Sequence, residues 1–351
     1  MAALYSVAFS INAVPAKQPK PQGLWVGGEK YFSEFQGKAL HKSGTPKAHL
    51  AFGSADYNAP FSIVFDAHQN LWTTFQVING LPSAVIEISR GEMASLKVGK
   101  PVKPKVIISP ANNSTVPFEV AGSIGFDAAG DLWVIDRNRT LLELLSSQIE
   151  TSGGPTPSVV IAPTDSVSVT LRFDESDNLW VVEFSTNFDP SYPEQIWRFT
   201  PSDRAASGPA NPSLVLNVPG QINVLDLAFD GSGNLWLAGS NAQGDEIEMI
   251  SVSDLSGTGE ITPSAGATVT SPTFTPNGSG SCLGGIDFDN SGDLWVSIHQ
   301  MSFGCDNAVV EFTPSQLSAG GNLTPPVIIG QNSTNTNLFL SGPIRFGPTV
   351  P

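Results

Sequence analysis

Short apolar strands recur along this chain, each followed by the same tight turn. Five copies of one phrase run from a Phe-Asp pair through four turn residues to Leu-Trp, at residues 65–72, 126–133, 173–180, 229–236 and 288–295. Apolar residues alternate before each Phe, as with Ile63 and Phe65, which predicts a strand with one packed face. The Asp and the Trp are six residues apart in every copy. A unit that returns every 47 to 61 residues indicates a repeat architecture.

The turn inside each phrase restricts the residue types that can stand at two of its positions. The Asp that begins the turn can accept backbone N–H groups. The fourth position, counted with this Asp as the first, often requires a positive φ angle. Gly stands at that position in three copies and Asp177, which tolerates it, in a fourth. Gln69 stands there in the first copy, so we expect that turn to be strained or differently shaped. The Trp that follows is large enough to fill the gap between neighbouring sheets.

Two further strands complete the unit. The third is predicted at residues 84–90, 194–202, 246–253 and 308–315, and the fourth at 105–109, 158–163, 213–219 and 326–330. Four antiparallel strands in roughly 50 to 60 residues form one blade of a β-propeller.

A sixth copy is split between the two ends of the chain. Residues 23–28 hold a second strand without its first, and residues 343–347 hold a first strand with nothing after it. Joined, they close the ring and remove its exposed edges. We therefore predict an all-β, six-bladed β-propeller of four-stranded antiparallel blades, with residues 1–351 as one domain and residues 1–20 as an N-terminal extension or outer strand. One Trp falls in each blade: Trp25, Trp72, Trp133, Trp180, Trp236 and Trp295.

Charge and composition narrow the partners. The chain has 17 basic and 32 acidic residues, a net charge of −15, and nucleic acids and anionic membranes both require a basic face. No stretch approaches the ~18 apolar residues of a membrane helix. Only 14% of residues are charged, and Ser, Thr, Gly and Pro are abundant, as in many secreted all-β proteins. We expect a secreted or periplasmic monomer, with a cytoplasmic location as the alternative.

The two cysteines bear on the compartment. Cys282 precedes the first strand of one blade and Cys305 follows its second strand, so antiparallel pairing brings both to one end of that blade. The two interpretations are a disulfide, which requires an oxidising compartment, and two small buried apolar residues. Residues 1–16 lack a basic start and are interrupted by Asn12, which does not favour a signal peptide.

The repeated phrase resembles that of NHL-repeat proteins and their six-bladed relatives, which include gluconolactonase/regucalcin-type lactonases and streptogramin B lyases. The resemblance covers nearly the whole chain and is specific for fold rather than function. It implies a ligand at the mouth of the central channel, on the face whose loops enter first strands and leave second strands. The candidate ligand-binding residues on those loops are Glu29, Gln76, Asp136, Arg137, Phe184, Asn187, Asn241 and Gln300.

The resemblance also implies a metal. Regucalcin-type lactonases hold a divalent cation on the axis with Glu, Asn and Asp from different blades, and hard oxygen ligands suit Ca²⁺ or Mg²⁺. The matching positions here are Glu29, Asp136, Glu183 and Asn241. The lactonase signature around an early Glu-Gly-Pro stretch is absent, and the alternative is a solvated acidic rim.

His299 is the candidate general acid or base. It follows Trp295 by four residues, at the same face, and a carboxylate such as Glu29 or Glu183 would tune it. The alternative is a structural histidine at the root of a loop. A catalytic zinc site is not expected, because the chain has four histidines and this is the one placed for chemistry.

Three charged residues stand directly before first-strand aromatic residues or their equivalents: Arg172, Asp287 and Arg345. One interpretation is a paired network that plugs the channel, because unpaired charge there is costly. The other is an anion site for a carboxylate ligand.

Two hypotheses follow. The first is an extracytoplasmic module that binds a small molecule or peptide at the channel mouth. The alternative is a divalent-metal-dependent hydrolase or lyase, lactonase-like or streptogramin-lyase-like, with His299 and Glu183 as catalytic residues. The scarcity of histidine and the missing lactonase signature favour binding.

Overall fold

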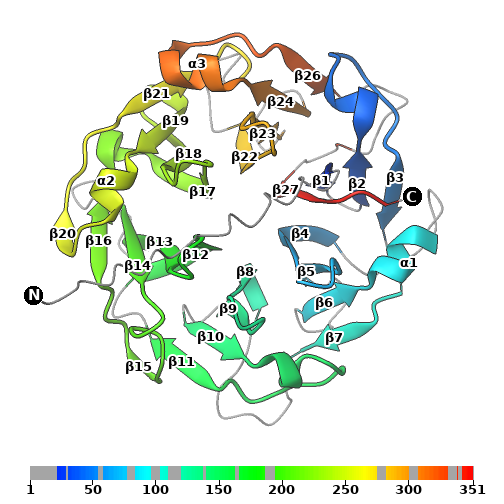
Figure 1. Ribbon diagram of the computed structural model, residues 1–351, viewed down its shortest axis with the longest axis vertical. Coiled ribbons are helices and arrows are strands. Elements are labelled where there is room, and N and C mark those ends of the chain that lie inside the picture. Colours follow the sequence, from blue (N-terminus) through cyan, green and yellow to red (C-terminus); the bar gives the residue numbers. More distant parts are fainter. Residues whose placement is uncertain are drawn as a thin grey trace, which may run out of the picture.

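Six small sheets surround a central axis in the computed structural model (Figure 1). It describes residues 22–28, 31–53, 58–76, 84–95, 103–109, 120–136, 140–162, 166–185, 194–274, 282–299, 307–330, 338 and 342–350. The predicted all-β, six-bladed propeller is confirmed. In the described part of the chain, no helix is both long enough and apolar enough to span a bilayer.

Each blade has four antiparallel strands, and the first lies nearest the axis (Figure 1). The first strands are β4 (Asn58–Phe65), β8 (Val120–Phe126), β12 (Ser166–Phe173), β17 (Asn223–Phe229), β22 (Leu283–Phe288) and β27 (Ile344–Pro348). The second strands are β5 (Leu71–Gln76), β9 (Leu132–Asp136), β13 (Leu179–Ser185), β18 (Leu235–Asn241), β23 (Leu294–Ile298) and β1 (Gln22–Gly27). The third strands are β6 (Ala84–Ile88), β10 (Leu141–Leu144), β14 (Gln195–Phe199), β19 (Gly244–Ile250), β24 (Ala308–Phe312) and β2 (Tyr31–Phe35). The fourth strands are β7 (Val106–Ile108), β11 (Val159–Ala162), β16 (Leu214–Asn217), β21 (Ala267–Thr270), β26 (Val327–Gly330) and β3 (Leu50–Gly53).

The fixed interval between Asp and Trp has a direct cause. In each of the five copies, the indole Nε1–H of the Trp donates to Oδ2 of the turn Asp six residues earlier, as from Trp180 to Asp174 at 2.8 Å. The other oxygen of that carboxylate accepts two backbone N–H groups of the turn. The fourth turn position has a positive φ in every copy, and Gln69 adopts it as well, at 65°. The first turn therefore has the same shape as the others and not a different one, and Gln69 adopts a φ that is disfavoured for a residue with a side chain.

Aromatic rings join the blades. The Trp of one blade packs on the Phe at the equivalent position of the next blade's first strand. The ring centroids are 5.6 to 6.0 Å apart in the pairs Trp25–Phe65, Trp72–Phe126, Trp180–Phe229, Trp236–Phe288 and Trp295–Phe346. Buried Ile, Leu and Val from the facing strands surround each pair. The core is thus divided among the spaces between blades.

The two ends of the chain complete one blade, as predicted. β27 pairs antiparallel with β1, and Trp25 lies opposite Arg345. This blade has no turn Asp, so the indole of Trp25 donates instead to the backbone oxygen of Pro348 at 3.2 Å. Two residues on, the N–H of Val350 donates to Oε1 of Glu34 at 3.1 Å. The C-terminal residues thus replace the missing turn.

Glu34 makes the closing blade sensitive to pH. Its side chain is fully buried and its Oε2 has no hydrogen-bond partner. Burial raises the pKa of this carboxyl to about 7, although the Val350 bond opposes the rise. A raised pKa stabilises the fold fully below about pH 4.5, and that contribution is lost as the pH rises through 7.

We expect Glu34→Gln to flatten this pH dependence. The neutral amide carries no buried charge at alkaline pH, so the variant should gain up to roughly 3 kcal/mol over the parent between about pH 5 and about pH 8. Urea unfolding at both pH values measures the difference. Glu150→Gln, at an exposed position, is the control. An unchanged pH slope in Glu34→Gln would show that the native carboxyl is already ionised at pH 5.

The outer edges of the blades are covered by a contact that the sequence did not predict. Short segments of the next blade pair in parallel with three fourth strands: β15 (Gly208–Pro209) with β11, β20 (Gly259–Ile261) with β16, and β25 (Gly321–Asn322) with β21. Gly153 and Gly44 form single bridges to β7 and β26 in the same way. Each segment satisfies edge groups that would otherwise template aggregation.

The predicted third strands run too far at their C-terminal ends. They end at Ile88, Phe199, Ile250 and Phe312, and a helical turn follows in three of these blades. These helices are α1 (Arg90–Ser95), α2 (Val252–Leu255) and α3 (Pro314–Ala319), with shorter 3₁₀ turns η1 (Gly37–Leu40), η2 (Ser146–Gln148) and η3 (Pro219–Gln221) elsewhere. The reason is capping, since Thr313 accepts the N–H of Gln316 and starts α3.

Candidate functional site

Charged side chains meet on the axis around Asp226, a residue of β17 that is 8% exposed. Nη2 of Arg172 lies 3.2 and 3.0 Å from its two carboxylate oxygens. Nη1 of Arg345 lies 4.0 Å from Oδ2. The backbone N–H of Ile286 donates to the same oxygen at 3.0 Å. The blade of β12 and the three blades that follow it, with first strands β17, β22 and β27, therefore each contribute a group to one cluster.

The cluster spans the axis at this level. β12, which carries Arg172, and β27, which carries Arg345, are three blades apart in a ring of six and so lie on opposite sides of the axis (Figure 1). Both guanidinium groups reach toward one carboxylate between them. Arg172 and Arg345 each directly precede the Phe of their first strand, and Asp226 precedes its Phe by three residues, so the cluster forms a floor beneath the loop face, which lies at the start of the first strands.

The sequence missed the central member of this network. It proposed Arg172, Asp287 and Arg345, whereas the carboxylate that Arg172 contacts is Asp226. One signal could have found it: Asp226 precedes the Phe of its strand by three residues, where the equivalent residues of other blades are Ser62, Ser123 and Thr170.

Asp287 lies beside the network rather than at its centre. Its Oδ2 accepts the backbone N–H of Phe346 at 2.7 Å. Burial raises the pKa of this carboxyl to about 6; the Arg172 guanidinium opposes the rise and the Asp226 charge adds to it. Asp287 is therefore the axial group whose charge changes just below neutral pH.

The predicted residues of the channel mouth are placed as follows. Asp136 and Glu183 are each 3% exposed, and Oδ1 of Asp136 accepts the backbone N–H of Thr140 at 2.9 Å. The amide of Asn241 accepts the N–H of Gln243 at 2.9 Å and donates to Gly220 O and Glu246. Gln76 ends β5, and Phe184 lies in β13. Glu29, Arg137, Asn187 and Gln300 lie outside the described residues.

His299 follows β23, and its backbone N–H donates to Cys282 O at 2.8 Å. Burial lowers the pKa of its imidazole, and a hydrogen bond with the Leu283 backbone opposes the fall. Since that bond favours the protonated ring, the imidazole is the donor in it. The other ring nitrogen of the neutral form keeps a lone pair. No carboxylate contributes to the shift within the described chain, so the expected tuning by Glu183 stays a prediction.

Cys282 is disulfide-bonded. Its predicted partner, Cys305, lies outside the described residues, so the pairing stays a prediction.

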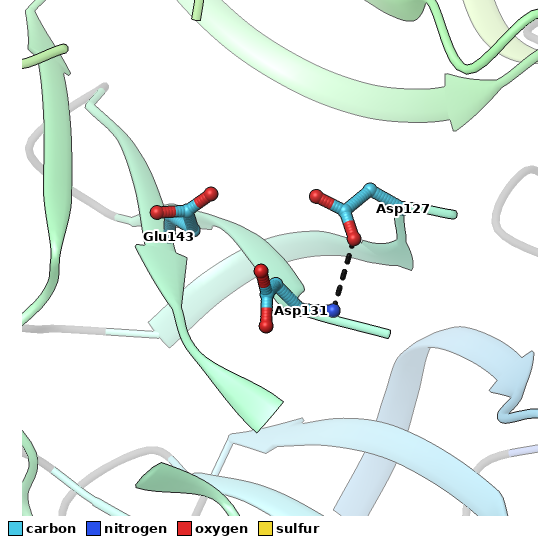
Figure 2. A group of neighbouring side chains, drawn as sticks. All are labelled: Asp127, Asp131 and Glu143. Atoms are coloured by element: carbon cyan, nitrogen blue, oxygen red, sulfur yellow. Dashed lines mark hydrogen bonds between the residues drawn. The ribbon is translucent and has the colours of Figure 1, made fainter. Parts of the chain in front are cut away.

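One group of three carboxylates comes together in the described residues, and it is not at the mouth. Figure 2 shows Asp127 and Asp131 in the turn between β8 and β9, with Glu143 beside them on β10. One oxygen from each lies within 4.8 Å of the others. Neighbouring negative charge adds to burial in raising the pKa of Glu143. Such a set is compatible with a divalent cation.

The guanidinium of Arg204 already pairs with one of these carboxylates. Arg204, which is 5% exposed, places Nη1 3.0 Å from Oδ2 of Asp127 and also pairs with Asp177. Its guanidinium carbon lies 5.3 Å from the ring centre of Trp133 and 5.1 Å from that of Phe173. Oδ1 of Asp131 is taken by the N–H of Ser146 at 2.7 Å. Few carboxylate oxygens remain for a metal, so no chemical step is assigned to one at this position.

Comparison with known proteins supports the fold. No protein-family model and no curated protein sequence matches the chain. A protein of unknown function from Bacteroides caccae is 10% identical, with 94% of this chain and 100% of that one covered and a TM-score of 0.58. A protein from Lactobacillus plantarum is 12% identical, with 93% and 99% covered and a TM-score of 0.53. A luciferin-regenerating enzyme is 12% identical, with 84% and 94% covered and a TM-score of 0.51. The predicted resemblance to six-bladed propellers of this group is confirmed at the level of the fold.

Proposed function

We propose that this propeller binds a small molecule or peptide at the loop-face end of its axis. The observation that carries the proposal is the charged floor around Asp226. A through-channel needs no paired charges across its centre, whereas a site with a closed bottom gains from a polar base beneath the ligand. The loops that surround the mouth supply specificity, since loops on a rigid scaffold tolerate variation.

A metal-dependent hydrolase or lyase of the lactonase or streptogramin-lyase kind is the second candidate. The observation that favours it is His299, because burial lowers the pKa of its imidazole and the neutral ring has a lone pair that can accept a proton. The luciferin-regenerating enzyme shows that this fold can carry catalysis. A calcium or magnesium ion bound at the mouth would supply a Lewis acid beside that base.

Screening for ligands tests both candidates. A library of lactones, sugar acids and short peptides is scored by the rise in melting temperature that each compound causes. We expect compounds that bind at the mouth to lose most of this rise in His299→Ala and to keep it in His68→Ala. His68 is an exposed histidine in a turn on the opposite face, so it is a matched control. Hits that survive His299→Ala unchanged would place binding elsewhere.

Elemental analysis then separates the two functions. A stoichiometric divalent ion that a chelator removes, together with lactone turnover that His299→Ala abolishes, would establish the enzyme. Binding without turnover in the metal-loaded protein would establish the binding module.

A further inference from the structure

Of the two arginines on the axis, Arg345 makes fewer hydrogen bonds to the described part of the protein than Arg172. Among the described residues, its guanidinium donates one hydrogen bond, from Nη1 to the oxygen of its own neighbour Ile344 at 2.9 Å. The nearest carboxylate oxygen, on Asp226, is 4.0 Å away. A guanidinium has five N–H donors. The side chain is 12% exposed, and no acceptor for the remaining donors is found among the described residues.

The other buried arginines contact more protein acceptors than Arg345 does, and Arg204, whose Nε has no partner, still pairs with two carboxylates. Arg172 donates from Nε to Leu227 O and from Nη2 to Asp226 and Ile286 O. Arg198 uses all three of its nitrogens on oxygen atoms of its own and the next blade. Arg345 differs in that its one hydrogen bond goes to the backbone of the adjacent residue, whereas each of the others reaches acceptors elsewhere in the fold.

From this imbalance we propose that Arg345 anchors an anion site on the axis, which takes the carboxylate of a small ligand bound at the mouth. The inference rests on the proposed function and adds the chemical class of the ligand. A planar guanidinium with adjacent free donors matches a carboxylate in two parallel hydrogen bonds. Its position in the floor places the anionic end of the ligand deepest and the rest toward the loops.

The neighbouring acids leave this site open to an anion. Asp226 is neutralised by Arg172 and accepts the N–H groups of Leu227 and Ile286. The charges of Arg172 on β12 and Asp226 on β17 act on Asp287, and its Oδ2 accepts the backbone N–H of Phe346 on β27. Burial raises the pKa of Asp287 to about 6, so it loses its charge as the solution becomes mildly acidic. The axis then carries two positive groups and one negative, and it attracts an anion more strongly.

Acetate and its neutral isostere acetamide test the site at constant ionic strength. We expect acetate, and not acetamide, to raise the melting temperature and to give a saturable calorimetric titration. Arg345→Gln should abolish the acetate response. Arg90→Gln, which removes an exposed arginine beside a turn on the other face, should keep it. Equal responses to acetate and acetamide, or an acetate response that survives in Arg345→Gln, would overturn the assignment.

Asp287→Asn gives a second readout that does not depend on removing the anchor. Acetate affinity of the parent should rise up to about tenfold from about pH 7.5 to about pH 5.5. Asp287→Asn should bind tightly at both pH values, and a pH dependence that persists in this variant would contradict the proposal. Failure of the acetate experiments leaves the His299-dependent ligand response intact, so it removes the anion site and not the proposed function.

Discussion

Asp226→Ser is expected to lower the free energy of unfolding by roughly 3–5 kcal/mol, as breaking a buried ion pair does. The substitution leaves Arg172 without its carboxylate while its side chain is 11% exposed. It also removes the acceptor of the Ile286 N–H at the axis. Urea unfolding at neutral pH measures the loss.

The other blades indicate how the loss can be rescued. In β4, Ser62 stands at the position equivalent to Asp226, and Val64 stands at the position equivalent to Arg172. Arg172→Val combined with Asp226→Ser reproduces that neutral pattern across two blades, and we expect it to recover more than half of the lost stability. A cost below about 1 kcal/mol for Asp226→Ser, or no recovery in the double variant, would mean that the pair does not hold the axis together.

The ring could be predicted because its constraints are local and repeated. The Asp-to-Trp interval reflects one hydrogen bond that every complete copy makes, so each copy keeps the same two residues at the same distance. The positive φ of the turn selects Gly or Asp177 in four of five copies. Even the split blade was visible, because residues 23–28 and 343–347 carry complementary halves of one phrase.

The axis could be predicted only in part, because a different blade supplies each of its residues. A first-strand position is repeated in sequence, but what faces it across the axis depends on blades one to three units away. Arg172 and Arg345 were therefore found as charged exceptions, whereas the pairing with Asp226 needed the ring geometry. The parallel outer segments were missed for a similar reason, since Gly153 and Gly208 contact the preceding blade and not their own.

The mouth is the least predictable region, because its loops carry no repeated constraint. Asp136 and Asn241 stand at similar distances from their tryptophans, yet each is engaged in bonds with its own or an adjacent loop. Where such side chains point depends on the loops that carry them, and the repeated phrase does not fix those loops.

Arg204→Leu is expected to cost roughly 3–5 kcal/mol at neutral pH, although it restores the residue type of the other blades. Arg204 stands five positions after the last residue of its third strand. The residues at this position in the other five blades are buried and apolar: Leu40, Met93, Ile149, Leu255 and Leu317. Arg204 adjoins a turn that has Asp131 where three other copies have Asn; the fifth copy has Asp293 there, with Leu40 in the next blade. Without the guanidinium, Asp127 and Glu143 lose the cation between them.

The pH dependence of this variant has a definite sign. Arg204 lowers the pKa of Glu143 against the effect of burial, so its removal raises that pKa further. A raised pKa means stability that is present in acid and lost as the pH rises. The deficit of Arg204→Leu should therefore be larger at about pH 8 than at about pH 5 in urea unfolding.

Asp131→Asn is the matched rescue. In three blades the Asn amide donates to Oδ2 of the turn Asp at 2.9 Å, which is the oxygen that Arg204 contacts in this blade. The introduced side-chain amide would keep an oxygen for the N–H of Ser146, as Asn234 does for Val252. Arg204→Leu with Asp131→Asn should then recover most of the loss, because an amide replaces the guanidinium as donor. If the double variant is no more stable than Arg204→Leu, the arginine acts by stacking between Trp133 and Phe173 and not by neutralising the acids.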